Sequence, residues 1–135
     1  MPVSVGDTRE LVIVDDLSRT QIVQYAGASG DYNPLHSDEI YATKVAGFPS
    51  VFAHGMLTMG MTGTLLPDTV GDGRLTKFGG RFTSQVWPGD TLTAVATVEA
   101  IREEEGQPLV DLTVATTNQD GVQVFSGNAT ARIDP

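Results

Sequence analysis

The sequence predicts an α+β fold in which a five-stranded antiparallel sheet curls around a central glycine-rich helix. One strand-like run lies near the N-terminus, and four more follow in the C-terminal half, separated by short turns. Short turns between consecutive strands are typical of antiparallel sheets. The helical material lies between the first strand and the other four. Because 135 residues is the size of one ordinary domain, we expect a single domain over residues 1–135.

The first strand and the first helix have local signals. The run "TRELVIVDD", residues 8–16, is short and rich in apolar and β-branched side chains, which favours a strand. Ser18 followed three residues later by Gln21 is a capping box, so a helix should begin there. Gly27 and Gly30 should end it.

A loop and a second, short helix come next. Asn33 precedes Pro34, which pushes Asn33 towards an extended conformation. Ser37 followed by two acids has the composition of a helix start, because a serine side chain and first-turn acids both stabilise the N-terminus. We expect this helix to stop around Gly47.

The central helix is predicted over residues 53–67, "AHGMLTMGMTGTLLP". It contains three glycines, Gly55, Gly60 and Gly63, each of which costs roughly 1 kcal/mol relative to alanine inside a helix. It has no charged residue unless His54 is protonated, and its apolar side chains point all round it. Such a helix should be buried on every side, with glycines that let other backbone approach closely.

Four strand-like runs are predicted to wrap this helix. They are "RLTKFGGRFTSQV", "DTLTAVATVEAIREE", "PLVDLTVATTNQ" and "VQVFSGNATARI". Asp120–Gly121 is a strong hairpin signal between the last two runs. Gly79–Gly80 inside a strand indicates a bulge or a close contact.

Composition limits the function. The net charge of −9 opposes binding to nucleic acid or to an anionic membrane. The chain has no cysteine, no apolar run near the ~18 residues that cross a bilayer, and an N-terminus unlike a signal peptide, so we expect a cytoplasmic location. Arg74, Lys77 and Arg81 gather within eight positions, either as ordinary surface charge or as a landing place for a phosphorylated ligand.

Three stretches carry a resemblance to a known family. They are "YAGASGDYNPLHSDEIYA", "FPSVFAHGMLTMG" and "RFTSQVWPGDTL", in this order over most of the chain. The sequence resembles the MaoC-like, (R)-specific enoyl-thioester hydratase and dehydratase family of the hot-dog fold. The resemblance implies hydration of a trans-2-enoyl thioester to an (R)-3-hydroxyacyl thioester, or the reverse. It implies a lyase that needs no cofactor, with coenzyme A or acyl carrier protein as the thioester handle.

The resemblance also implies roles for named residues. Asp31 and His36 align with the family's catalytic pair, which activates one water as general acid–base groups. Gly55 aligns with the backbone position that binds the thioester oxygen at the start of the central helix. Independently of the resemblance, we expect Asn33 to brace the loop and His54 to shape the site as a residue satisfied by hydrogen bonds, and we expect both to contribute to substrate binding. Arg81 is expected to help bind the nucleotide end of coenzyme A.

Other interpretations of the same residues stay open. Asp31 alone is typical of a turn, and His36 of a polar residue before a helix. A metal site of Asp31, His36 and His54 is disfavoured by the long separation of the two histidines, so no metal is expected. A hot-dog thioesterase is disfavoured because residues 55–66 contain no acid. The resemblance also implies a dimer or a larger assembly, and we expect a homodimer. The active subunit of a heterodimer is the alternative to a homodimer, and a non-catalytic acyl-binding protein is the remaining alternative to an enzyme.

Overall fold

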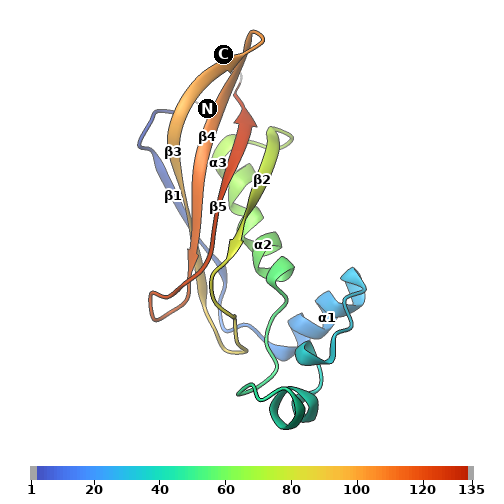
Figure 1. Cartoon of the computed structure of the whole chain (residues 1–135). Coiled ribbons are helices and arrows are strands. Elements are labelled where there is room, and N and C mark those ends of the chain that lie inside the picture. The colour runs from blue at the N-terminus through green and yellow to red at the C-terminus, as the bar shows by residue number, and fades with distance from the viewer. Residues whose placement is uncertain (1–2, 134–135) are drawn as a thin grey trace.

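The computed structural model describes residues 3–133, in which five strands form one curved sheet (Figure 1). The strands are β1 (Thr8–Val14), β2 (Leu75–Phe82), β3 (Leu92–Glu104), β4 (Gln107–Thr117) and β5 (Gln123–Arg132). Their order across the sheet is β1-β3-β4-β5-β2, and every neighbouring pair is antiparallel. The predicted α+β architecture is confirmed, with the N-terminal strand at one edge and β2 at the other.

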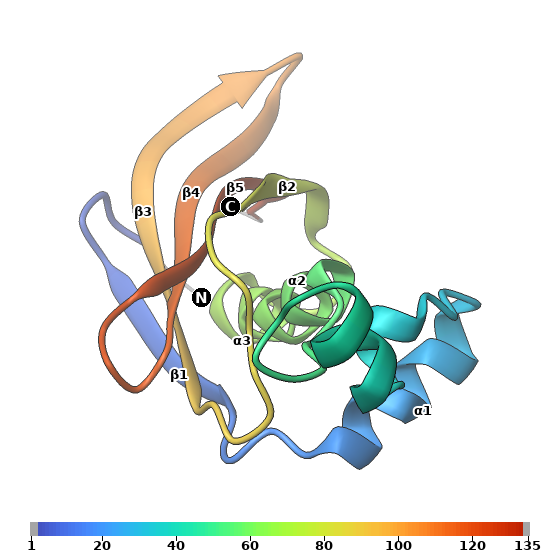
Figure 2. The same cartoon turned by 60° about the horizontal axis from the view of Figure 1, so that its bottom comes forward.

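The helices lie on one side of this sheet and at one end of it. They are α1 (Arg19–Ser29), the short helical turns η1 (Pro34–His36) and η2 (Tyr41–Val45), α2 (Gly55–Gly63) and α3 (Leu65–Val70). Helices α2 and α3 run along the concave side, while α1 and the short turns gather beyond the start of α2 (Figures 1 and 2). Within residues 3–133 no helix is long and apolar enough to cross a membrane.

The first helix begins as predicted and ends later than one of its two proposed stops. Both hydrogen bonds of the Ser18–Gln21 capping box are present. Gly30 ends α1 with a left-handed φ of 78°, and its N–H donates to the Ala26 carbonyl. Gly27 lies inside the helix, so the prediction that it ends α1 is wrong.

The second helix is capped by a different side chain from the one that the sequence predicts. The carboxylate of Asp38, not the hydroxyl of Ser37, accepts a hydrogen bond from the Tyr41 N–H, at 3.1 Å. Ser37 instead follows the last residue of η1, and its own N–H donates to the Pro34 carbonyl. Because Ser37 belongs to the end of η1, the adjacent Asp38 is the residue that caps the second helix.

The central helix is broken in two, where the sequence predicted one long helix. Helix α2 ends at Gly63 and α3 begins at Leu65. Pro67 explains the position of the break, because a proline removes the hydrogen bond to the carbonyl four residues earlier and its ring clashes with it. That carbonyl belongs to Gly63. The Thr64 N–H donates instead to the Met61 carbonyl, at 3.2 Å.

The sheet covers only one side of α2, so the prediction of a helix buried all round is wrong for the single chain. Its fully buried residues are Thr58 and Thr62, whereas the Met56 side chain is 56% exposed. Thr62 can be buried because its hydroxyl pairs with that of Thr116 on β4, at 2.7 Å. The face that the sheet leaves uncovered contains the Met56 side chain.

The glycines of the central helix and of β2 differ in what lies close to them. A Cβ added at Gly63 would lie 3.3 Å from the ring of Phe78, while one added at Gly60 would meet nothing within 4 Å. On β2, a Cβ at Gly80 would lie 2.5 Å from the Ser126 carbonyl oxygen. The pairing of β2 with β5 is regular through Gly79 and Gly80, so the close contact is confirmed and the bulge is not.

The core lies between the concave face of the sheet and the helices. Alternate residues of β3 point inward and are buried from Leu92 to Val98, as the sequence pattern predicts. Leu65 and Leu66 of α3 pack against them and against β4, and both are fully buried. A second cluster centred on Phe125 and Val124 supports the start of α2. The packing therefore anchors both ends of the broken helix.

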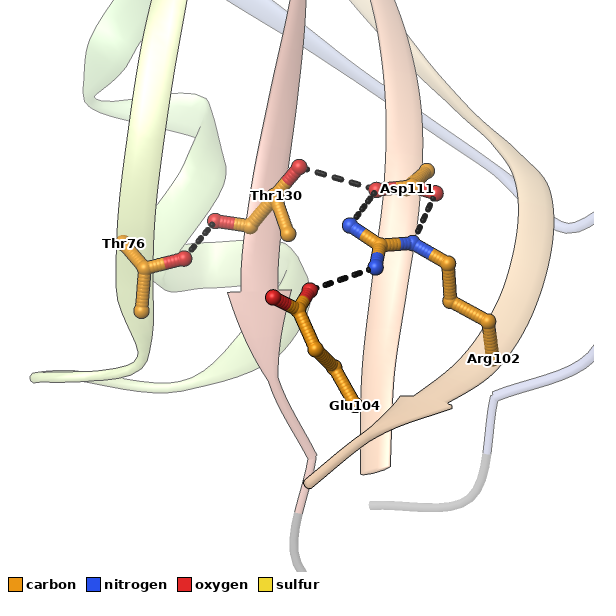
Figure 3. A network of polar contacts seen from close by, with 5 residues as sticks. All are labelled: Thr76, Arg102, Glu104, Asp111 and Thr130. Atoms are coloured by element: carbon orange, nitrogen blue, oxygen red, sulfur yellow. Dashed lines mark hydrogen bonds and ion pairs between the residues drawn. The ribbon is translucent and has the colours of Figure 1, made fainter. Parts of the chain in front are cut away.

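A polar network ties four strands together on the exposed side of the sheet (Figure 3). The Arg102 guanidinium donates to both carboxylate oxygens of Asp111, at 2.7 and 3.3 Å, and to Glu104 at 2.8 Å. Thr130 donates to Asp111, and Thr76 donates to the Thr130 carbonyl. Because Arg102 neutralises it, the pKa of Asp111 is lowered.

Candidate active site

The loop after α1 holds Asp31 in a defined turn. The Asp31 N–H donates to the Ser29 hydroxyl at 3.1 Å, and the Asn33 N–H donates to one Asp31 carboxylate oxygen at 3.3 Å. The Asn33 side chain accepts from the Leu35 N–H at 3.0 Å, which braces the loop as predicted. The turn interpretation of Asp31 is therefore correct, but the turn uses only one of its two carboxylate oxygens.

His36 is fixed by the segment that precedes α2. Its Nδ1 lies 2.7 Å from the Phe52 carbonyl oxygen, and the Phe52 N–H donates back to the Leu35 carbonyl. Since a carbonyl can only accept, Nδ1 must carry the proton. In neutral His36 the lone pair is then on Nε2. The ring is half-buried and could accept a proton at that nitrogen.

His54 is the N-cap residue of α2 and is almost fully buried, at 2% exposure. Its ring stacks on that of His36, with centroids 3.8 Å apart and planes 22° apart. Its Nε2 donates to the Asp31 carbonyl at 3.1 Å. The prediction that hydrogen bonds satisfy this residue is only half right, because its buried Nδ1 has no partner among residues 3–133.

Burial decides the charge of His54. Removing the ring from water disfavours its charged form, and the pKa of His54 is lowered, with the nearby His36 adding to the effect. The bond to the Asp31 carbonyl acts in the opposite direction and is the weaker influence. Neutral His54 therefore connects the Asp31 backbone to the His36 ring.

The fold brings three side chains together that the sequence separates by up to 23 residues. A carboxylate oxygen of Asp31 and one ring nitrogen each of His36 and His54 lie within 4.8 Å of one another. A water at about 2.8 Å from two of these atoms bridges such a gap. The separation of the two histidines in the sequence does not keep them apart in the fold, so it does not exclude a metal. The near-parallel imidazole rings, however, direct their lone pairs side by side rather than at one ion. The arrangement suits a shared water better.

The first turn of α2 faces the same place. The His54 side chain makes no capping hydrogen bond, so the N–H groups that open the helix, beginning with Gly55, lack a side-chain acceptor. The helix dipole makes this end favourable for negative charge. A Cβ at Gly55 would lie 3.0 Å from the Phe82 ring, so a side chain here would require that ring to shift, which is consistent with the predicted steric role of this glycine.

Two cavities meet at Gly55. The first, of about 470 Å³, we call the Asp31 cavity; among its lining residues are Asp31, His36, His54, Gly55, Met56 and Phe82. The second, of about 420 Å³, we call the Val124 cavity; it borders Gly55, Phe82, Thr58, Val86 and Val124. Sequence reasoning missed Tyr25, Ser29 and Phe82 as lining residues. For Phe82 the one available signal is an aromatic residue at the end of a strand.

Two predicted binding residues do not line either cavity. Asn33 is exposed and its side chain is engaged in the loop. Arg81 is exposed on β2, and since adjacent strand side chains point to opposite faces, it points away from the side on which Phe82 meets Gly55. Lys77 has the same parity and lies near Asp111. Contact of Asn33 with substrate, and of Arg74, Lys77 and Arg81 with a nucleotide, stay predictions.

Comparison with known proteins identifies the family. The sequence profile of the MaoC like domain matches residues 2–120. The chain belongs to this family. The MaoC-like chain is 31% identical over 116 residues to the (R)-specific enoyl-CoA hydratase of Aeromonas caviae, and the match covers 84% of each protein. The solved structure of the (R)-hydratase from A. caviae, with 28% identity, superposes with a TM-score of 0.85 over 98% of both chains.

Other relatives are longer. The chain is 47% identical over 70 residues to 3-hydroxyacyl-thioester dehydratase Y of Mycobacterium tuberculosis, a match that covers 50% of this chain and 24% of that protein. The chain thus spans about a quarter to a third of the first curated relatives it matches. The predicted family and the hot-dog fold are confirmed.

Proposed function

We propose that this MaoC-like protein is a lyase that adds water to a trans-2-enoyl thioester to give an (R)-3-hydroxyacyl thioester, or catalyses the reverse dehydration. The observation that carries the proposal is the meeting of Asp31, His36 and the opening turn of α2 around one cavity. The names of relatives as (R)-specific enoyl-CoA hydratase and 3-hydroxyacyl-thioester dehydratase support it.

The pair Asp31 and His36 would hold one water between two acceptors. Because the His36 Nδ1–H donates a hydrogen bond to the Phe52 carbonyl, Nε2 would accept one hydrogen of the water, and the Asp31 carboxylate would accept the other. The oxygen lone pairs are then left to attack the β-carbon of the enoyl group. Asp31 would accept the proton lost by the water, while His36 orients that water and shares its proton. Delivery of the proton to the α-carbon completes the addition of one water.

The start of α2 would stabilise the charge that builds on the thioester oxygen. Its unpaired N–H groups and the helix dipole favour an oxyanion at Gly55, and such donors typically contribute 10²–10³-fold to turnover. Buried, neutral His54 adds no charge of its own. The thioester would be carried by coenzyme A or by acyl carrier protein, and the reaction uses no cofactor.

A direct test is hydration of crotonyl-CoA by the purified chain, followed by the loss of absorbance of the conjugated thioester. We expect turnover, and a product that only an (R)-specific 3-hydroxyacyl-CoA dehydrogenase oxidises. A product of (S) configuration would contradict the stereochemical part of the proposal.

Thiol release, measured in the same reaction, separates the hydratase from a hot-dog thioesterase. The central helix residues 55–66 contain no acid, so we expect no free coenzyme A. Release of thiol without loss of the enoyl group would replace the proposal with the thioesterase alternative. Absence of both reactions, with binding of acyl thioester retained, would indicate a non-catalytic acyl-binding protein.

A further inference from the structure

Phe82 stands where the two cavities meet. It is the last residue of β2, at the edge of the sheet, and both the Asp31 cavity and the Val124 cavity border its ring and Gly55. The ring lies against the Gly55 backbone so closely that an added Cβ would be 3.0 Å from two of its carbons. The ring therefore forms a partition between the two cavities.

The Val124 cavity fits an uncharged, mostly apolar ligand. Its wall includes Ala53, Val86 and Val124, each at most 5% exposed and each part of the hydrophobic cluster beneath α2. Among the described residues, none that lines this cavity is an Asp, Glu, Lys or Arg, and its polar lining consists of the uncharged Thr58, Thr83, Ser84 and Gln85. Its volume of about 420 Å³ is within the range of sites that take small ligands. The phosphates of a nucleotide would find no cation there, whereas a hydrocarbon chain would be removed from water.

The Phe82 ring borders both the cavity of the acid–base pair and the Val124 cavity, so it would affect which acyl chains reach the second cavity. In the reaction proposed above, the β-carbon lies beside Asp31 and His36, and the acyl chain continues from that carbon. A short chain would be accommodated within the Asp31 cavity, and a longer chain that extends towards Phe82 would reach the Val124 cavity only past the ring of Phe82. Phe82 is 48% exposed, and its one described ring contact, with Phe125, is tilted at 5.7 Å between centroids. Phe125 itself is fully buried, so a variant at position 82 must be shown to fold as the parent does.

We propose that Phe82 is a specificity-determining residue that limits the acyl-chain length by separating the Asp31 cavity from an acyl-chain site in the Val124 cavity. This inference depends on the proposed function for the identity of the ligand. It does not depend on Arg81, which points to the other face of β2.

The test compares kcat/KM for crotonyl-CoA and trans-2-octenoyl-CoA in the parent and in Phe82 variants. Phe82→Ala should raise the octenoyl-to-crotonyl ratio by at least about tenfold, since each methylene that gains an apolar site contributes on that order. Phe82→Leu, which keeps an apolar side chain at the strand end, should raise it less. Phe82→Trp should lower it. Leu75→Ala removes an apolar side chain from the other end of the same strand and should leave the ratio unchanged.

Failure of this inference can be told from failure of the proposed function. A parent that hydrates crotonyl-CoA, with folded Phe82→Ala and Phe82→Leu variants that keep the parental ratio, would overturn the partition and leave the function standing. If the parent hydrates nothing, calorimetric binding of octanoyl-CoA provides a second readout. Tighter binding by Phe82→Ala and weaker binding by Phe82→Trp would support the partition, and equal affinities would overturn it.

Discussion

At the residue scale, the candidate site depends on which nitrogen of each histidine carries a proton. Carbonyl acceptors decide both cases, because the His36 Nδ1–H donates to the Phe52 carbonyl and the His54 Nε2–H donates to the Asp31 carbonyl. The resemblance of this stretch to a known family predicted an acid–base pair of Asp31 and His36, and the fold places both side chains beside one cavity. The stacking of His54 on His36 could not be predicted, since it follows from how the segment before α2 passes beside the loop.

The buried Nδ1 of His54 predicts a pH effect on stability. The pKa of His54 is lowered, so between its folded value and the ordinary value of about 6.5 the unfolded chain binds more protons than the folded one. The stability contributed by neutral His54 is present above that ordinary value and is lost as the pH falls through the folded pKa. We expect Tm to fall more between pH 7.5 and pH 5 in the parent than in His54→Phe, which keeps an aromatic ring at this position.

His36, the other histidine, is present in both proteins and serves as the internal control. An equal loss of Tm in the parent and in His54→Phe over this pH range would contradict the assignment of His54 as a neutral, buried ring.

At the scale of elements, the sequence predicted the five strands and the first helix better than it predicted the central helix. Alternation, the capping box and the Asp120–Gly121 turn are local signals, and each is consistent with the structure. The break at Thr64 was also encoded locally, by Pro67, but the apolar run around it outweighed that signal. Exposure of Met56 depends on which face the sheet covers, and no local pattern shows that.

The network in Figure 3 makes a prediction about the strands that it joins. Asp111→Asn removes the charge that pairs with Arg102, and because both side chains are partly exposed, we expect a small loss of stability at pH 7. The pKa of Asp111 is lowered, so its contribution is present above the ordinary Asp value and is lost as the pH falls through the folded pKa. Urea unfolding at pH 7 and pH 3 should show a difference from the parent that shrinks at the lower pH. A constant difference would contradict the charge-based account.

At the scale of the whole molecule, the sheet has open edges at β1 and β2. Exposed edges invite pairing with another chain. The β2 edge ends at Phe82, beside the site, and Met56 exposes an apolar side chain nearby. A second chain at the β2 edge would lie beside Met56, on the face of α2 that the sheet of one chain leaves uncovered.

We therefore expect a homodimer joined through sheet edges, with the active site near the interface. Sedimentation equilibrium should give twice the mass of one chain. The net charge of −9 on each copy opposes association, so added salt should tighten the dimer by screening that repulsion. A stable monomer with full activity would contradict this expectation.

The most direct test of the central claim, that Asp31 and His36 activate one water, is turnover of crotonyl-CoA by Asp31→Asn. Asparagine keeps the shape of the side chain and can still accept the turn hydrogen bond from the Asn33 N–H, but it cannot take a proton. We expect kcat to fall by at least about 10²-fold, with unchanged Tm and a modest change in KM. His36→Ala should behave similarly, and the double variant should be little worse than the poorer single one. Asp31→Asn protein that melts like the parent and still hydrates crotonyl-CoA at a comparable rate would contradict the account.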